Sequence, residues 1–120
     1  MENVNEVAKD LLTRVELTDI DELIKNESID SKKKLLDALI EEYKKNPGAT
    51  TAGNLFTVFI SIGHEQKLKT HIIESLKRVI RHDVPKEVKV PIVASKGFIK
   101  FSNVFAADIA DYTKKQKKRK

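Results

Sequence analysis

The chain has 120 residues, 40% of them hydrophobic and 34% charged, and it contains no cysteine. That length suits a single domain with a buried core, and the absence of cysteine excludes disulfides, thiolate chemistry and cysteine-ligated zinc. The net charge is +5, from 23 Lys and Arg against 18 Asp and Glu. Six of these cations end the chain, at Lys114, Lys115, Lys117, Lys118, Arg119 and Lys120. Without them 17 cations face the 18 acids, so we expect one near-neutral folded domain over residues 1–113 and a disordered basic tail over 114–120.

The first ten residues and the longest apolar stretch both argue against a membrane protein. Residues 1–10 are acid-rich and contain no apolar run, so we expect no signal peptide. Thr57 and Ser61 interrupt the apolar stretch at 55–62, which is too short to span a bilayer. We therefore expect a soluble cytoplasmic protein with no membrane partner, or a nuclear one if the cell has a nucleus.

The first thirty residues predict two helices. Apolar residues recur at helical spacing through residues 3–16, which indicates an amphipathic helix. Thr18 is a good N-cap because its hydroxyl can accept a hydrogen bond from an unpaired amide of the following turn. A short helix then runs to about Asn26.

Residues 30–46 form the next predicted helix, with Ser28 or Asp30 as its cap and Pro47 as its end. Residues 50–62 fit two structures. A buried helix would place on one face Leu55, Val58, Phe59 and Ile62. A strand would place on one face Phe56, Val58, Ile60 and Ile62. We expect a helix here, because Ala52-Gly53-Asn54 is a poor start for a strand and the neighbouring segments read as helices.

Residues 65–81 predict an amphipathic helix with a basic polar face. Its apolar stripe consists of Leu68, Ile72, Leu76, Val79 and Ile80. Its opposite side carries four cations and one acid, namely Lys67, Lys77, Arg78, Arg81 and Glu74. Pro85 ends the segment.

Residues 88–101 predict a β-hairpin. Val88, Val90 and Ile92 alternate with other residues at a period of two, and 98–101 forms a second short run. Ser95-Lys96-Gly97 suits a tight turn in which Gly97 takes positive φ. Because Pro91 cannot donate to a ladder, its strand is expected at an edge or at a bulge. Ser102 or Asn103 would cap a last helix.

The expected fold class is mainly α with one C-terminal β-hairpin. The order of elements over residues 30–113 resembles that of winged helix-turn-helix domains, in which the helix before the hairpin enters the major groove. The resemblance is one of architecture alone. With Gly63 as the turn glycine, Phe59 stands where a small residue is usual, and Lys69 stands where a buried aliphatic residue is usual. The alternative fold is an all-α bundle with a hairpin appendage.

The three histidines are the first candidates for metal binding or acid–base chemistry. On one continuous helix His64, His71 and His82 would share a stripe, but seven residues of helix rise roughly 10 Å, too far for two to chelate one ion. Asp108 and Asp111 would share a helix face without a third ligand, which indicates a solvated face. The four glycines form no nucleotide-binding motif. We therefore expect no metal, no cofactor and no enzymatic activity.

Basic residues recur on four predicted surfaces: the tail, the 65–81 helix, the hairpin, and the Lys32-Lys33-Lys34 run. Positive charge is unfavourable at a helix start, so an anionic partner would relieve its cost at that run. Residues 31–113 hold fourteen cations and nine acids, whereas residues 1–30 hold three cations and nine acids. The basic surfaces therefore lie in the second segment and the tail.

These features predict a small nucleic-acid-binding protein of the regulator or accessory type, with DNA favoured over RNA. Besides the six tail cations, the expected contact residues are Gln66, Lys67, Thr70, Lys77, Arg78, Arg81, Lys89, Lys96 and Lys100. Homodimerisation through the N-terminal or last helix is also expected, because operators are commonly read as paired half-sites. The alternative is a protein-interaction module or a small subunit of a larger assembly. In that case the tail would serve localisation or solubility.

Overall fold

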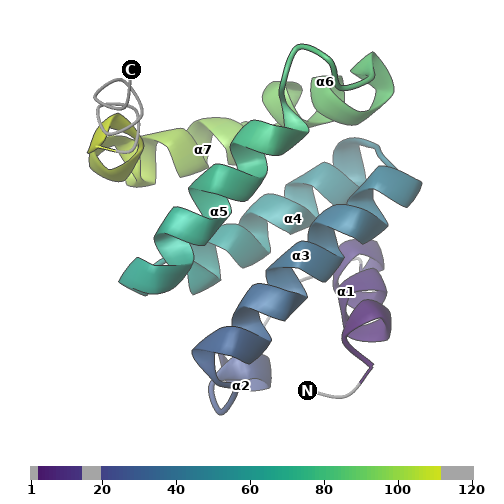
Figure 1. Ribbon diagram of the computed structural model, residues 1–120. Coiled ribbons are helices and arrows are strands. Elements are labelled where there is room, and N and C mark those ends of the chain that lie inside the picture. The colour runs from purple at the N-terminus through teal and green to yellow at the C-terminus, as the bar shows by residue number, and fades with distance from the viewer. Residues whose placement is uncertain (1–2, 15–19, 112–120) are drawn as a thin grey trace.

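The computed structural model describes residues 3–14 and 20–111, and its regular structure is helical throughout these ranges (Figure 1). The helices are α1 (Val4–Thr13), α2 (Ile20–Ile24), α3 (Ile29–Lys45), α4 (Ala49–Ile62), α5 (Gln66–Val79), α6 (Lys86–Ala94) and α7 (Lys96–Val104). A further helical turn covers 106–111. No strand occurs in the described ranges.

Helix α4 is the centre of the fold and packs against each of the other six helices. It has no charged residue, and seven of its fourteen residues are buried, including Leu55, Phe56 and Phe59. Phe56 and Phe59 of α4 meet Phe101 of α7 in an aromatic cluster with ring centroids 6.0–6.3 Å apart. In the part of the chain that the structure describes, no helix is both long and apolar enough to cross a membrane.

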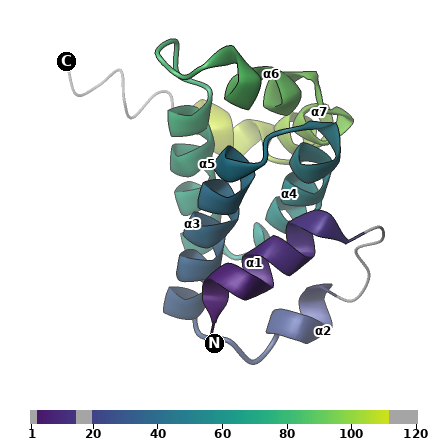
Figure 2. The same ribbon diagram turned by 90° about the vertical axis from the view of Figure 1, so that its right-hand side faces the viewer.

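Helices α3 and α5 lie side by side and run in the same direction (Figures 1 and 2). Near their starts, Lys32 Nζ is 3.0 Å from Glu65 Oε1. Further along, His71 Nε2 is 2.8 Å from Asp37 Oδ1. This parallel arrangement is possible because α4 runs back between them, and it places the polar edges of α3 and α5 next to each other.

The helices of the first eighty residues occur where the apolar spacing predicted them, with ends that differ by a few residues. Ser28 is confirmed as the cap of α3, because its Oγ accepts a hydrogen bond of 3.1 Å from the Ser31 amide. The ambiguous segment 50–62 is confirmed as a helix, α4. The predicted cap at Thr18 lies outside the described residues.

The predicted β-hairpin and the winged-helix arrangement are wrong, because residues 88–101 belong to two helices, α6 and α7. Ser95 is the N-cap of α7 and not a hairpin turn, since its Oγ accepts a hydrogen bond of 3.1 Å from the Gly97 amide. Gly97 does not take positive φ. The bundle in the alternative fold is therefore correct, but its hairpin appendage is absent from the described residues.

The apolar residues of α6 and α7 fit a helix as well as a strand. Val88 and Ile92 are two strand positions of one face, but they are also one helical turn apart. In α6 these two side chains pack toward the core. Tyr43 of α3 adds a fixed contact, because its hydroxyl donates a hydrogen bond to the Val88 carbonyl. Pro91 lies inside α6, where its missing N–H leaves the Glu87 carbonyl without its usual helical donor.

Candidate nucleic-acid interface

The outer face of α5 carries the polar residues that the sequence predicted there. They share one side of the helix and are exposed or half-buried: Gln66, Lys67, Thr70, Lys77, Arg78 and Arg81. The opposite side of α5 is buried through Leu68, Ile72, Leu76 and Val79. The structure thus brings these six residues together on one surface.

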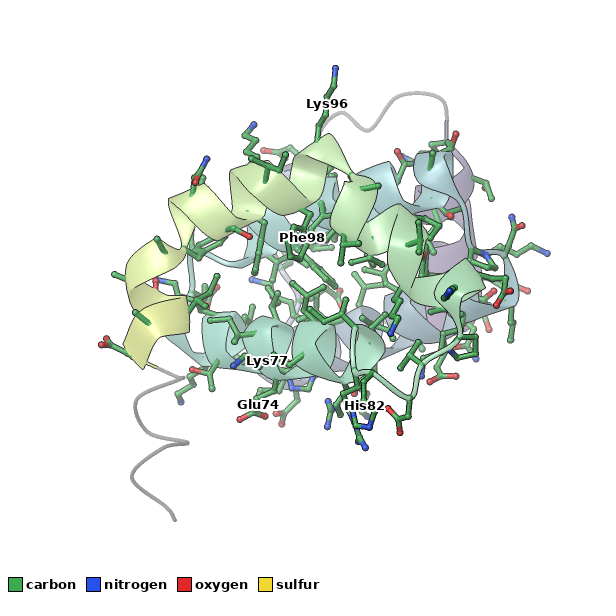
Figure 3. All side chains as sticks on the ribbon, turned by 90° about the horizontal axis from the view of Figure 1, so that it is seen from above. Glu74, Lys77, His82, Lys96 and Phe98 are labelled. Atoms are coloured by element: carbon green, nitrogen blue, oxygen red, sulfur yellow. The ribbon has the colours of Figure 1, made fainter. Side chains whose placement is uncertain are left out.

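Acidic residues reduce the positive potential of that surface. Glu74 lies on α5 itself, and Figure 3 shows it beside Lys77. Asp37 and Glu41 of the neighbouring α3 line a cavity of about 280 Å³ between α3 and α5, together with Arg78. The outer face of α5 is therefore a surface of mixed charge, flanked by acids that the spacing on α5 alone does not reveal.

Several of the predicted contact residues already bind groups of the protein itself, and Arg78 Nη2 donates a hydrogen bond of 3.3 Å to Ser75 Oγ. Lys89 Nζ is 3.4 Å from the Arg81 carbonyl and 3.3 Å from the His82 carbonyl, which follow the last turn of α5. A cation at a helix C-terminus satisfies carbonyls that have no helical donor. Arg81 is also paired with Asp83, at 3.2 Å between Nη2 and Oδ2.

Lys96 and Lys100 lie far from the outer face of α5. Both are exposed on α7, one turn apart. Figure 3 shows Lys96 and Lys77 at opposite edges of the molecule, with Phe98 on the side of α7 that faces α5. A duplex on the outer face of α5 would therefore not reach Lys96, and the structure does not join these residues into one groove-binding surface.

A second group of cations lies where α3 and α5 begin. Lys32 is paired with Glu65, but Lys33 and Lys34 of α3 and Lys67 of α5 form no ion pair with any described residue. We call Lys33, Lys34 and Lys67 the cation cluster. The Lys32–Glu65 bridge holds the two helix starts together and so places the cluster at one end of the molecule.

The last described residues are attached next to this end. Lys69 Nζ of α5 is 3.4 Å from Asp108 Oδ2, and it lies 5.6 Å from the centroid of the Phe105 ring. Both Lys69 and Asp108 are largely buried side chains for charged residues. Asp108 is thus a structural ion-pair partner and not part of the solvated face expected for it. The tail at 114–120, expected to be disordered, lies outside the described residues and follows this anchored segment.

His64 and His71 have different surroundings. His71 contacts Asp37, whereas the His64 ring lies 6.4 Å from the Phe105 ring. A cavity of about 370 Å³ beside α2 includes Lys32, His64 and Glu65, two of which are paired with each other. Among the described residues, no group of three or more His, Asp or Glu side chains could hold a metal ion.

Comparison with models of protein families, with curated proteins and with solved structures finds no match for this chain.

Proposed function

We propose that this protein binds nucleic acid through the phosphate backbone, with duplex DNA as its favoured ligand. The observation that supports the proposal most is the basic tail and its attachment beside the cation cluster. The Lys69–Asp108 bridge ties the segment before the tail to α5, and the tail itself contributes six cations within seven residues. Flexible basic segments of this kind contribute salt-dependent affinity for polyanions.

The charges near the cation cluster indicate how the affinity for nucleic acid is divided between the cluster and the tail. Glu65 and Asp108 are already matched by lysines. Asp30, an exposed acid in the first turn of α3, lies close in sequence to Lys33 and Lys34 and offsets part of their charge. The cluster alone is thus a weak site for phosphate, and most of the affinity is assigned to the tail.

No Phe or Tyr side chain is exposed among the described residues, which favours a duplex over single strands. Single-stranded nucleic acid is commonly held by bases that stack on aromatic rings. In the described ranges, the large hydrophobic side chains that are exposed are aliphatic: Leu23, Val90, Val93, Ile99 and Val104. Phosphate contacts position a protein on a duplex but read no sequence, so we propose binding with low sequence selectivity.

Fluorescence anisotropy with labelled duplex DNA, single-stranded DNA and duplex RNA at low salt tests this function. We expect binding of duplex DNA by the full chain and weaker binding when Lys33, Lys34 and Lys67 are changed to glutamine. A matched control changes Lys86, Lys96 and Lys100 to glutamine, which removes the same charge from α6 and α7 and is expected to cost less affinity. Failure of the full chain to bind any of the three ligands at low salt would refute the proposal.

A further inference from the structure

Helices α6 and α7 carry most of the exposed aliphatic surface of the described chain. Among the described residues, five large hydrophobic side chains are exposed, and four of these five belong to α6 and α7. On α6, Val90 is 50% exposed and Val93 is 45% exposed. On α7, Ile99 is 60% exposed. Single exposed aliphatic residues are common, but a concentration of them on one part of a small protein indicates a binding surface.

The apolar character of α6 extends over both of its sides. Val88 and Ile92 face the core, whereas Val90, Val93 and Ala94, at the spacing of one helical face, are exposed. A helix that packs on one side only normally carries polar residues on the other. The outward side of α6 is therefore built like the buried side of a helix, although nothing in the described chain covers it.

Ile99 extends this surface across the corner between the two helices. Ser95 alone separates α6 from α7. On α7, Ile99 lies opposite the buried Phe101, on the same side as Lys96. Val104 lies more than a third of a turn away around α7, so we exclude it. We call Val90, Val93, Ala94 and Ile99 the α6–α7 outer face.

The charges around the α6–α7 outer face are mostly positive. Lys86, Lys96 and Lys100 are exposed and form no ion pair with any described residue, and Glu87 is the one acid within α6 and α7. Elsewhere in the described chain, Lys32, Lys44, Lys45 and Lys69 each have a carboxylate partner. The α6–α7 outer face thus combines uncovered aliphatic side chains with lysines that lack carboxylates.

The aliphatic side chains and unpaired lysines of the α6–α7 outer face favour some classes of binding partner over others. A second copy joined through the same face would bring two sets of lysines together, which opposes association. Phosphates would pair with the lysines but would leave the valines and Ile99 uncovered. A membrane surface is usually engaged by aromatic and larger apolar side chains, and the exposed large hydrophobic residues of α6 and α7 are all aliphatic.

We propose that the α6–α7 outer face docks an acidic amphipathic segment of a partner protein. In the docked state, aliphatic side chains of the segment cover Val90, Val93 and Ile99, and its carboxylates pair with Lys86, Lys96 and Lys100. This is the helix-on-surface mode of recognition, in which apolar anchors give affinity and rim charges give selectivity. Lys96 of this face and Lys77 of α5 lie at opposite edges of the molecule (Figure 3), and the proposal does not depend on the proposed nucleic-acid contact.

Titration of the full, isotope-labelled chain with designed amphipathic helical peptides tests the proposal by NMR. The acidic probe repeats leucine and glutamate, the basic probe repeats leucine and lysine, and the neutral probe repeats leucine and glutamine. We expect the acidic probe to shift amide signals of residues 86–100 and to slow amide exchange in α6. The basic probe should leave them unchanged. Equal response to the acidic and basic probes, or shifts confined to other helices, would overturn the proposal.

Amino-acid substitutions distinguish specific binding at the α6–α7 outer face from non-specific binding to any exposed hydrophobic side chain. V93K with I99K is expected to weaken binding of the acidic probe by about tenfold or more, as for central interface residues. L23K alters the exposed leucine on α2 and should bind like the unaltered chain. All three side chains are exposed, so we expect thermal unfolding to be nearly unchanged. K96E with K100E should shift preference toward the basic probe, and unchanged preference would count against the charge assignment.

Two further measurements test whether the α6–α7 outer face binds a membrane or a second copy of the chain instead. The first is sedimentation with phosphatidylglycerol vesicles, and we expect the α6–α7 outer face to take no part in vesicle binding. If the unaltered chain binds the vesicles and V93K with I99K abolishes that binding, the surface is assigned to a membrane instead. Signals of residues 86–100 should not depend on protein concentration, since such dependence would assign the surface to self-association.

Discussion

Replacement of Gly97 by alanine tests the close approach of α7 to α4. An ideal Cβ at Gly97 would lie 2.6 Å from Phe56 Cβ, about 1 Å inside the usual carbon–carbon contact of about 3.5–4.0 Å. Phe56 cannot move away freely, because its ring lies 6.0 Å from that of Phe59 and 5.8 Å from that of Phe98. We therefore expect α7 to shift away from α4 in this variant.

The size of the effect follows from two opposing contributions. Overpacking in a dense core costs about 1–3 kcal/mol, whereas alanine in place of glycine within a helix gains about 1 kcal/mol. The expected net loss is thus up to about 2 kcal/mol in the free energy of unfolding, or a fall of up to about 8 °C in Tm. Urea unfolding followed by circular dichroism measures it.

Gly53→Ala is the matched control. Gly53 lies inside α4, and a Cβ there would meet no atom within 4 Å. The helix propensity gain is then unopposed, so we expect stabilisation by about 0.5–1 kcal/mol. If Gly97→Ala instead proves more stable than the unaltered chain, as is expected of Gly53→Ala, the described packing of α7 on α4 is refuted.

Two other predictions concern hydrogen bonds between helices. Tyr43→Phe removes the donor to the Val88 carbonyl and should cost about 1–2 kcal/mol at neutral pH. Burial raises the pKa of Tyr43 from 10.0 to about 12, so the unfolded chain ionises first, and stability should be complete below pH 10 and fall by up to about 2.7 kcal/mol as pH rises through 12. Urea midpoints against pH for both proteins check this, and an equal alkaline loss in Tyr43→Phe would contradict it. The Asn54 side-chain amide donates to the carbonyls of Leu12 and Arg14 at 2.9 and 3.0 Å. Asn54→Asp should therefore destabilise the chain more than Asn54→Ala, with fast amide exchange in α1 as the readout, and an Asn54→Asp variant of unaltered stability would refute this capping role.

The helices up to residue 80 could be predicted because each buries one face against α4 or its neighbours. Apolar residues then recur at helical spacing, as in α3 and α5. The ambiguity at residues 50–62 has a physical origin, because apolar residues of α4 lie both at its buried positions and at the half-buried Ile60, which obscures the helical period. Its lack of charged residues was the usable signal.

The error at residues 88–101 came from the period-two alternation of Val88, Val90 and Ile92 and from the interpretation of Ser95-Lys96-Gly97 as a tight turn. The stronger signal for α7 was the spacing of Phe98, Phe101 and Phe105, three and four residues apart, which suits one helical face. Tertiary contacts decide the structure here. Ile92 and Phe101 are buried against the core, and Tyr43 holds α6. Intrinsic propensity is a weak guide when such contacts are available.

The candidate interface was only partly predictable. The polar side of α5 follows from its own period. The acids beside it do not, because Asp37 and Glu41 belong to α3 and approach α5 only through the parallel packing of the two helices. Likewise, the separation of Lys96 from α5 (Figure 3) follows from the helical structure of α7 and could not be seen while a hairpin was expected.

The most direct test of the proposed function is the salt dependence of duplex-DNA binding. The full chain is compared with a variant in which all six tail cations are replaced by glutamine. The slope of log affinity against log salt should be steep for the full chain. Because each phosphate contact contributes roughly 0.9 to this slope, it should become shallower by up to about five in the variant. A slope that is near zero for the full chain, or identical for the two proteins, would contradict the assignment of the tail as the main phosphate-binding element.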